Sequence, residues 1–432
     1  MRLLIAALAA LALTACATAG PPSRSADPFA EVAPAYVKLI LKIGEHEDGY
    51  VDAYYGPAGW QAEAKADKGT IEELQAEASR LVAELEAIDE VHELTPLQER
   101  RMAFLLEHIN AAQFRLGMIA GRKSDFRTEA RELFGVQLEL KPLSEYDPLL
   151  ARVEALVPGP GPLSDRVEAF RNRYVIPKDR LEPVFRAAIA ECRRRTAAHI
   201  RLPADESFVL EFVTGKSWSG YNWYKGGAHS LIQVNTDFPI FISRAVDLGC
   251  HEGYPGHHTH NALLEDRLVK GEGFVEFSVY PLYSPLSLIA EGTSNYGIEL
   301  AFPGVEKTRF EAQTLYPLAG LDPATAAAYG ELEDAIDALS GARMTIAAEY
   351  LDGRIDRETA IAMAQKYQLI SRERAEQSIR FTEGYRSYVI NYGLGKEMAA
   401  AHVEAAAADQ AGRWRALERV LSSPTLPRDL GE

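Results

Sequence analysis

Cysteine is scarce in this sequence of 432 residues: there are three, against 62 acidic and 46 basic residues. Long apolar runs are also rare, because beyond the first residues no segment approaches the roughly 18 apolar residues that a membrane-spanning helix needs. The formal net charge is -16, and lysine and arginine form no stripe interleaved with aromatic residues. Nucleic acids require such a basic surface, so we expect no nucleic-acid partner.

The amino terminus has the pattern of an export signal. Arg2 supplies a positive charge, and residues 3–13 form an apolar run that is too short to remain in a bilayer as a spanning helix. The run ends in Leu13-Thr14-Ala15-Cys16, which resembles the lipobox of bacterial lipoproteins. We therefore expect residues 1–15 to be a lipoprotein signal peptide and a lipidated Cys16 to be the only link to a membrane. The alternative is a secreted protein that is cut near Ala15.

Residues 16–30 have the composition of a flexible tether that follows the acylated cysteine, because alanine, proline, serine and glycine dominate and no apolar position recurs periodically. Ala17, rather than aspartate, follows Cys16, which resembles the sorting signal of lipoproteins anchored in the outer membrane and facing the periplasm. We expect residues 31–432 to form one helical domain with two lobes, since residues 157–162, VPGPGP, are the only stretch that resembles a seam.

The hydrophobic pattern predicts a mainly α fold with a small β-sheet. Apolar residues recur at spacings of three and four in residues 71–88, 97–119, 181–200, 329–350 and 360–369. Thr70 and Thr95 each stand three residues before Glu or Gln, which suits helix starts. Residues 207–213 and 230–234 are short apolar or alternating runs, so we expect two strands joined by an aromatic loop.

Four of the ten histidines fall within the ten residues HEGYPGHHTH, which begin at His251. In the zinc-peptidase arrangement H-E-x-x-H, two histidines one helical turn apart bind one Zn²⁺ and the glutamate faces the water to be activated. Here the position one turn after His251 is Pro255, and the next histidines lie too far around or along a straight helix. Proline followed by glycine distorts a helix, so we expect a bulge that brings His257 to the metal. His258 is the alternative ligand, or a group that supports the site or faces the substrate.

Residues 251–258, HEGYPGHH, resemble the H-E-x-x-P-G-H-H motif of the bacterial DUF885 family, which looks related to the gluzincin metallopeptidases. The downstream E-G-W-A-x-Y of that family is matched in part by residues 290–296, AEGTSNY, where Thr-Ser replaces Trp-Ala. Its Y-x-x-G is matched by residues 392–395, but the preceding Pro-Gly-Gln-Ala is replaced by residues 386–389, RSYV. The resemblance covers most of residues 205–396, and it implies a zincin-like metallopeptidase architecture with a metal cleft between helical lobes.

The same residues suggest roles in hydrolysis. We expect one Zn²⁺ per chain, bound by His251, His257 and Glu291, because two imidazoles and a carboxylate leave one coordination position for water. Glu252 would be the general base that takes a proton from this water and passes it to the leaving amine. Tyr392 is a candidate donor to the oxyanion, and the alternative is a core tyrosine with a bonded hydroxyl.

Other residues carry weaker signals. Asn235, at the end of the second strand, is a candidate for binding an extended peptide by strand addition. Arg386 and Tyr388 could contact a substrate carboxylate, although packing or exposure is the favoured interpretation. The aromatic side chains Trp218, Tyr221, Trp223 and Tyr224 either line a substrate site or simply pack together.

The two cysteines beyond Cys16 leave two questions open. Cys192 and Cys250 would be exported to a compartment that permits disulfides, but sequence does not tell whether they are close enough to pair. Cys250 also adjoins His251, so a thiolate ligand is an alternative, although neighbours on a helix point about 100° apart.

Together these features predict a zinc-dependent hydrolase, and most simply a peptidase that cleaves a peptide or a small amide. One alternative is a catalytically degenerate envelope binding protein on the same scaffold, because the family motifs are altered at residues 293–294 and 386–389. Another is a metal-dependent hydrolase of a non-peptide substrate, since the same residues could serve it.

Overall fold

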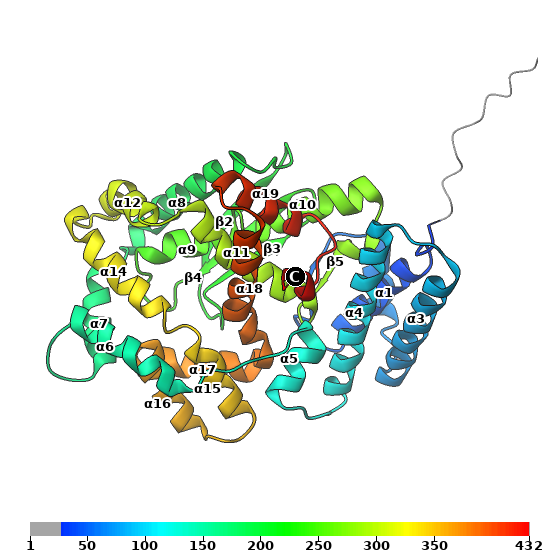
Figure 1. Cartoon of the computed structure of the whole chain (residues 1–432), viewed down its shortest axis with the longest axis horizontal. Helices are drawn as coiled ribbons and strands as arrows, with labels where there is room; N and C mark the ends of the chain where they lie inside the picture. Colours follow the sequence, from blue (N-terminus) through cyan, green and yellow to red (C-terminus); the bar gives the residue numbers. More distant parts are fainter. Residues whose placement is uncertain (1–26, 432) are drawn as a thin grey trace, which may run out of the picture.

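The computed structural model describes residues 27–431, so the predicted signal peptide, Cys16 and most of the predicted tether lie outside the described residues. Helices make up most of the described chain, and two small sheets complete it (Figure 1). The predicted mainly α fold with a small sheet is confirmed. Within residues 27–431, no helix is both long enough and apolar enough to cross a membrane.

The helices fall before and after the larger sheet. Before it are α1 (Val32–Gly44), α2 (Ala58–Ala66), α3 (Ile71–Val91), α4 (Pro96–Ile119), α5 (Phe126–Phe134), α6 (Asp147–Leu156), α7 (Leu163–Arg171) and α8 (Leu181–Ala197). After it are α9 (Ser243–Glu252), α10 (His257–Leu264), α11 (Pro285–Ala301), α12 (Glu306–Phe310), α13 (Tyr316–Ala319), α14 (Ala326–Asp337), α15 (Ala342–Leu351), α16 (Arg357–Gln368), α17 (Arg372–Tyr385), α18 (Ile390–Ala406) and α19 (Gln410–Leu421). Thr70 and Thr95 cap α3 and α4 with capping boxes, as their spacing to Glu and Gln predicts.

The larger sheet has three strands in the order β2-β4-β3. Strand β4 (His229–Asn235) lies in the centre, parallel to β2 (Ser207–Val213) and antiparallel to β3 (Gly220–Tyr224). The prediction of an aromatic loop between two strands was therefore wrong for residues 220–224. Glycines on both sides suggest a loop, but the aromatic side chains suit a strand, and burial within β3 has the period of two that a strand produces.

The smaller sheet joins distant parts of the chain. It pairs β1 (Val51–Tyr54) with β5 (Val279–Pro281) in antiparallel orientation. This pairing brings the amino-terminal helices next to the segment that leads into α11.

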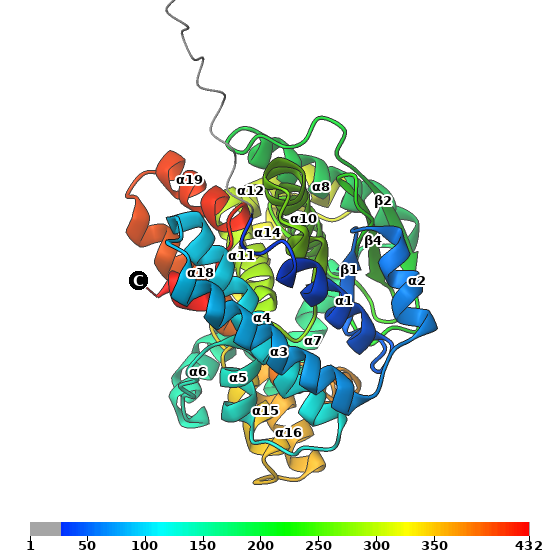
Figure 2. The ribbon, with the colours of Figure 1, turned by 90° about the vertical axis from the view of Figure 1, so that its right-hand side faces the viewer.

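Helices α11 and α18 lie side by side at the centre of the molecule, between a side that contains α1, α3 and α4 and a side that contains α8, α12 and α14 (Figures 1 and 2). Two glycines let the helices approach closely: a Cβ added to Gly292 would lie 2.3 Å from the carbonyl oxygen of Gly395. Leu288 of α11 packs in the hydrophobic cluster of the first side, whereas Leu300 packs in that of the second. The two central helices thus join both cores.

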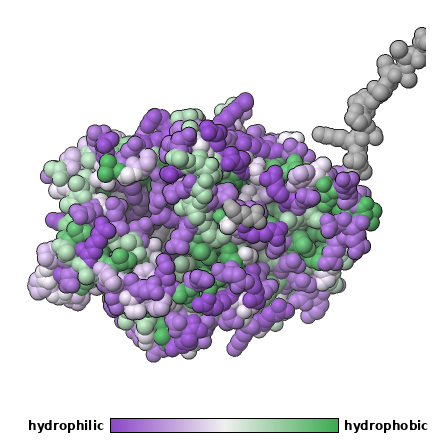
Figure 3. Space-filling view, viewed as in Figure 1, coloured by the Kyte–Doolittle hydropathy of each residue, from purple (hydrophilic) through white to green (hydrophobic). Residues whose placement is uncertain are grey.

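The predicted seam at residues 157–162 connects α6 to α7. Val153, Val157 and Val167, on both sides of this connection, lie in one hydrophobic cluster. The outer face seen in Figure 3 is mostly hydrophilic, with hydrophobic residues scattered among charged ones, as the many acidic and basic residues lead one to expect.

Candidate metal centre

The chain breaks between α9 and α10 at the position where the sequence predicts a distortion. Helix α9 ends at Glu252, and α10 begins at His257. A Cβ on Gly256 would lie 1.8 Å from the carbonyl oxygen of His251, so only glycine fits there. The expected bulge in one helix is therefore a complete interruption, because the intervening turn cannot continue the helix.

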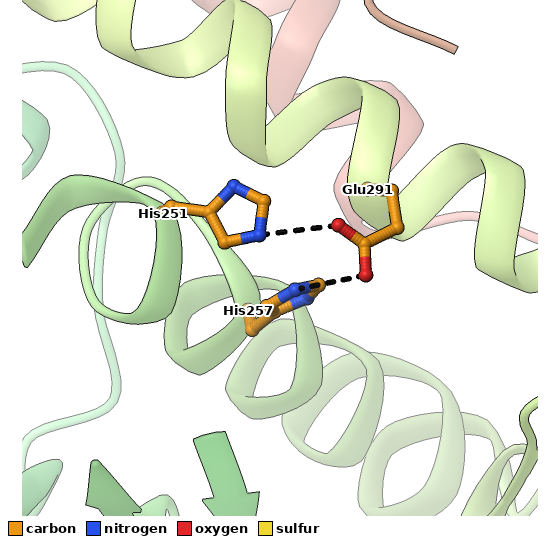
Figure 4. Close-up of side chains that lie close together, drawn as sticks. All are labelled: His251, His257 and Glu291. Carbon is orange, nitrogen blue, oxygen red and sulfur yellow. Dashed lines mark ion pairs between the residues drawn. The ribbon is translucent and has the colours of Figure 1, made fainter. Parts of the chain in front are cut away.

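This interruption brings three predicted ligands together. Figure 4 shows the carboxylate of Glu291, from α11, facing the imidazoles of His251 and His257. One donor atom from each residue lies within 4.8 Å of the other two. His251 Nε2 is 3.1 Å from Glu291 Oε2, and His257 Nε2 is 3.7 Å from Oε1. Ligands about 2.1 Å from one tetrahedral ion lie about 3.4 Å apart, so these separations fit a single metal ion.

Two further side chains hold the ligands in place. Asn295 Oδ1 lies 3.1 Å from His251 Nδ1, the ring nitrogen that does not face Glu291. The Tyr388 hydroxyl donates to Glu291 Oε1 at 2.7 Å. Such outer contacts orient ligands in metal sites. Asn295 was not predicted from the sequence. For Tyr388, packing or exposure was the favoured interpretation, and the one sequence feature that marks it is its position four residues before Tyr392.

Charge and burial prepare the site for a cation. Burial by itself raises the pKa of Glu291, but His257, His251 and the Tyr388 hydroxyl outweigh it and lower this pKa. Burial lowers the pKa of His257 to about 4, so its imidazole is neutral and can donate a lone pair at neutral pH. Glu291 Oε2 is buried and makes no well-aligned hydrogen bond among the described residues, although His251 Nε2 lies 3.1 Å away. A positive ion would satisfy this atom.

Glu252 is the last residue of α9, and its side chain lies against strand β3. Burial raises its pKa to about 7, and the charges of Glu291 and Asp52 act in the same direction. Its backbone carbonyl accepts a hydrogen bond of 2.6 Å from the Asn222 amide. A Cβ on Gly220 would lie 2.7 Å from Glu252 Oε1, so glycine at this position of β3 makes room for the carboxylate.

A third carboxylate near the site, Asp52 of β1, was not predicted. It accepts a hydrogen bond from the Tyr221 hydroxyl. Burial raises the pKa of Asp52 to about 7, and the charge of Glu291 adds to this effect. No local motif marks Asp52, because the antiparallel β1–β5 pairing is what brings it here.

His258 does not lie with the three candidate ligands. Its Nδ1 is 2.8 Å from Ser230 Oγ, and its Nε2 is 3.1 Å from Glu206 Oε2. The side chain is fully buried, and Tyr254 also donates to Glu206. Neighbouring residues on α10 point about 100° apart, so His258 supports the chain behind the site while His257 faces Glu291. Both His258 nitrogens are engaged, which excludes it here as the alternative ligand.

Two weaker predictions, for Asn235 and Arg386, have clear outcomes. The prediction of strand addition at Asn235 was wrong, because β4 is paired on both sides and the Asn235 amide donates to the carbonyls of Lys216 and Trp218. Arg386 forms an ion pair of 2.6 Å with Glu129, a fully buried carboxylate. This pairing, rather than a substrate carboxylate, satisfies its charge.

The aromatic segment packs against itself. The Tyr221 ring lies 5.4 Å from that of Trp218 and 4.4 Å from that of Trp223, and Tyr224 donates to Glu265. The Tyr221 hydroxyl also donates to Asp52 near the site.

The cysteines Cys192 and Cys250 form a disulfide that joins α8 to α9. Cys250 is therefore not a metal ligand. Tyr392 lies beside the cluster, with its ring stacked against that of His251 at a centroid distance of 6.4 Å. Burial raises the Tyr392 pKa well above its ordinary value, so the hydroxyl keeps its proton.

Comparison with known proteins adds similarities of fold at low sequence identity. No protein-family model matches the chain, and no curated protein matches it significantly. A candidate lipoprotein from Colwellia psychrerythraea has a TM-score of 0.49 and 15% identity over 82% of this chain and 69% of its own. Pyrococcus furiosus carboxypeptidase has a TM-score of 0.42 and 10% identity, with 91% and 90% of the two chains covered. The M32 carboxypeptidase of Deinococcus radiodurans R1 has a TM-score of 0.35 and 15% identity, over 90% of this chain and 89% of its own. The chain is similar to these proteins, and its function has to be argued from the side chains of the site.

Proposed function

We propose that this protein is a zinc-dependent hydrolase that cleaves an amide bond, most simply in a peptide. The observation that carries the proposal is the grouping of His251, His257 and Glu291, with donor atoms within 4.8 Å of one another and Glu252 next in the chain to the first of them. Two imidazole nitrogens and one carboxylate oxygen are a donor set that suits Zn²⁺. The buried, unbonded Glu291 Oε2 is in keeping with such an ion.

His251, His257 and Glu291 would hold the ion. When bound, Zn²⁺ supplies Lewis acidity that activates water and polarises a carbonyl. Glu252 then acts as the general base and passes the proton to the leaving nitrogen. Its pKa of about 7 suits both steps, because the carboxylate is available near neutral pH and its acid form can give the proton back. Tyr392, protonated and beside His251, would donate to the developing oxyanion.

An extended peptide would bind along β3 rather than at Asn235. The Lys225 N–H donates to the carbonyl of His229, and the Asn235 N–H donates to the carbonyl of Ser219. In the segment 219–225, the backbone N–H and C=O groups of the odd-numbered residues therefore point toward β4. The backbone groups of Gly220 and Asn222 therefore point away from β4, at the edge nearest Glu252. Such an edge can accept another strand.

The variant Glu252→Gln tests this proposal. It removes the base but none of the three candidate ligands, so we expect zinc to be retained and turnover of a peptide library to fall by about 10²–10⁴-fold. Retained zinc with no turnover even in the wild type would favour the degenerate binding protein. Cleavage of generic esters and not of peptides would favour a non-peptide hydrolase.

We also propose that the folded part is a single domain, exported and held at the outer membrane, facing the periplasm, by lipid on Cys16. Support comes from the lipobox-like Leu13 to Cys16 and from Ala17. Metabolic labelling with a fatty acid in wild type and in Cys16→Ala tests the anchor, and labelling that survives the substitution would contradict it.

A further inference from the structure

The side chain of Arg343, in the first turn of α15, makes no hydrogen bond and no ion pair within residues 27–431. Its Nε is buried and unbonded. Arg101 and Arg115, which are more deeply buried, both meet a carboxylate: Arg101 pairs with Glu276, and Arg115 pairs with Glu47. A guanidinium that has lost much of its water without gaining a counter-charge is costly, so this position favours an anion supplied from outside the chain.

The unpaired guanidinium lies close to the candidate metal centre. Arg343 Cζ is 5.0 Å from the ring centroid of Phe381 and 5.8 Å from that of Tyr392. The Tyr392 ring is stacked 6.4 Å from that of His251, so a single aromatic side chain separates the guanidinium from a candidate ligand. Arg343 and Tyr392 are both only partly buried, so part of the Arg343 side chain reaches solvent although its Nε does not.

The distances suit a particular part of a substrate. In a peptide whose last amide bond is cleaved, the terminal carboxylate lies about 4 Å beyond the scissile carbonyl carbon. A carboxylate bound by a guanidinium adds about 4 Å more between the two central carbons. A guanidinium that binds the terminal carboxylate should therefore lie roughly 8 to 11 Å from the metal. The distances from Arg343 Cζ to the Tyr392 ring, 5.8 Å, and from that ring to the His251 ring, 6.4 Å, allow a separation on this scale.

Resting on the proposed hydrolase function, we infer that Arg343 binds the free α-carboxylate of a peptide's C-terminal residue, so that the enzyme removes residues from that end. The guanidinium can form two parallel hydrogen bonds to a carboxylate, which fixes the last amide bond relative to the metal ligands. Hydrolysis then breaks the final C–N bond: the hydroxyl of water joins the carbonyl carbon, and a proton joins the nitrogen of the released amino acid. The acidic residues Glu252, Glu291 and Asp52 do not pair with Arg343, so it remains free for the substrate.

The test uses one peptide in two forms, with a free C-terminal carboxylate and with a C-terminal amide. We expect the wild type to have a kcat/KM about 100-fold higher for the acid form, because a hydrogen-bonded charge pair of this kind is worth about that factor. In Arg343→Gln, kcat/KM for the acid should fall to about the level of the amide, and Arg343→Lys should restore part of the preference. Arg354→Gln, which alters an exposed arginine paired with Glu349 beyond the end of α15, is the matched control and should keep the wild-type ratio.

The ratio of kcat/KM for the acid to kcat/KM for the amide distinguishes a carboxylate-binding residue from a structural one. If Arg343 were only structural, Arg343→Gln would lower kcat/KM for both peptides by the same factor. Equal cleavage of the two forms by the wild type would overturn the carboxylate site while leaving the hydrolase intact. If no peptide is cleaved, the hydrolase proposal fails, and binding of the two forms to zinc-loaded wild type and Arg343→Gln then decides the anchor by calorimetry. Tighter binding of the acid by the wild type that disappears in Arg343→Gln supports the carboxylate site. Equal binding of acid and amide by the wild type overturns the carboxylate site.

Discussion

The hydroxyl of Tyr388 should control how tightly the protein holds its metal. In Tyr388→Phe, only one oxygen is lost, together with its 2.7 Å hydrogen bond to Glu291 Oε1. The side chain is buried, so water has little room to replace the lost donor. A hydrogen bond to a charged acceptor is worth about 1.5–3 kcal/mol, and outer contacts of this kind change metal affinity by about 10–100-fold. We therefore expect the Kd for zinc to rise by about that factor.

Competition with a chromogenic chelator at fixed pH measures this change directly. Tyr385→Phe is the matched control, because Tyr385 also lies beside Tyr388 but makes no hydrogen bond to a candidate ligand within the described residues. A Kd in Tyr388→Phe equal to those of the wild type and the control would refute the claim that this hydroxyl orients a metal-binding carboxylate.

Three further predictions concern the scaffold. Gly292→Ala should lower Tm by several degrees, because its Cβ would lie 2.3 Å from the Gly395 carbonyl and overpacking costs about 1–3 kcal/mol; an unchanged Tm would contradict the close packing. Glu206→Ala should reduce the free energy of unfolding in urea by about 1–3 kcal/mol, since it leaves the buried His258 and the Tyr254 hydroxyl without their shared acceptor, and an unchanged free energy would argue against these contacts. Burial raises the pKa of Glu311 from 4.5 to about 8, so folding binds a proton and the wild type should lose stability as pH rises from about 4.5 to about 8. Glu311→Gln should weaken this dependence, measured by unfolding at pH 5 and pH 9, and parallel profiles would contradict it.

The candidate ligands could be predicted because their chemistry is local. His251 and His257 stand in one short motif, and the Pro255-Gly256 pair signals that the chain turns between them. Glu291 could be predicted as a ligand because it lies in a segment with a helical pattern downstream of that motif. Most helices could be predicted for the same reason, since amphipathic periodicity and capping boxes are properties of neighbouring residues. The predicted run 329–350 is the exception, because a turn at residues 338–341 divides it into α14 and α15.

The residues that the sequence did not reveal depend on contacts between distant segments. Asp52 reaches the site only because β1 pairs with β5, and Arg343 is notable because its side chain pairs with no carboxylate within residues 27–431. Asn235 was misassigned because hydrophobic alternation does not tell a central strand from an edge strand. Once β4 is known to be paired on both sides, the edge beside Glu252 belongs to β3.

The most direct measurement is the metal content of the purified protein, determined by elemental analysis for wild type and for His257→Ala after growth in zinc-replete medium. His258→Ala serves as the comparison, since the adjacent histidine bonds to Ser230 and Glu206 instead of facing Glu291. A centre formed by His251, His257 and Glu291 predicts about one zinc per chain in the wild type, loss of zinc in His257→Ala, and zinc retained in folded His258→Ala. A wild type without metal, or a His257→Ala variant that binds zinc as tightly as the wild type, would contradict it.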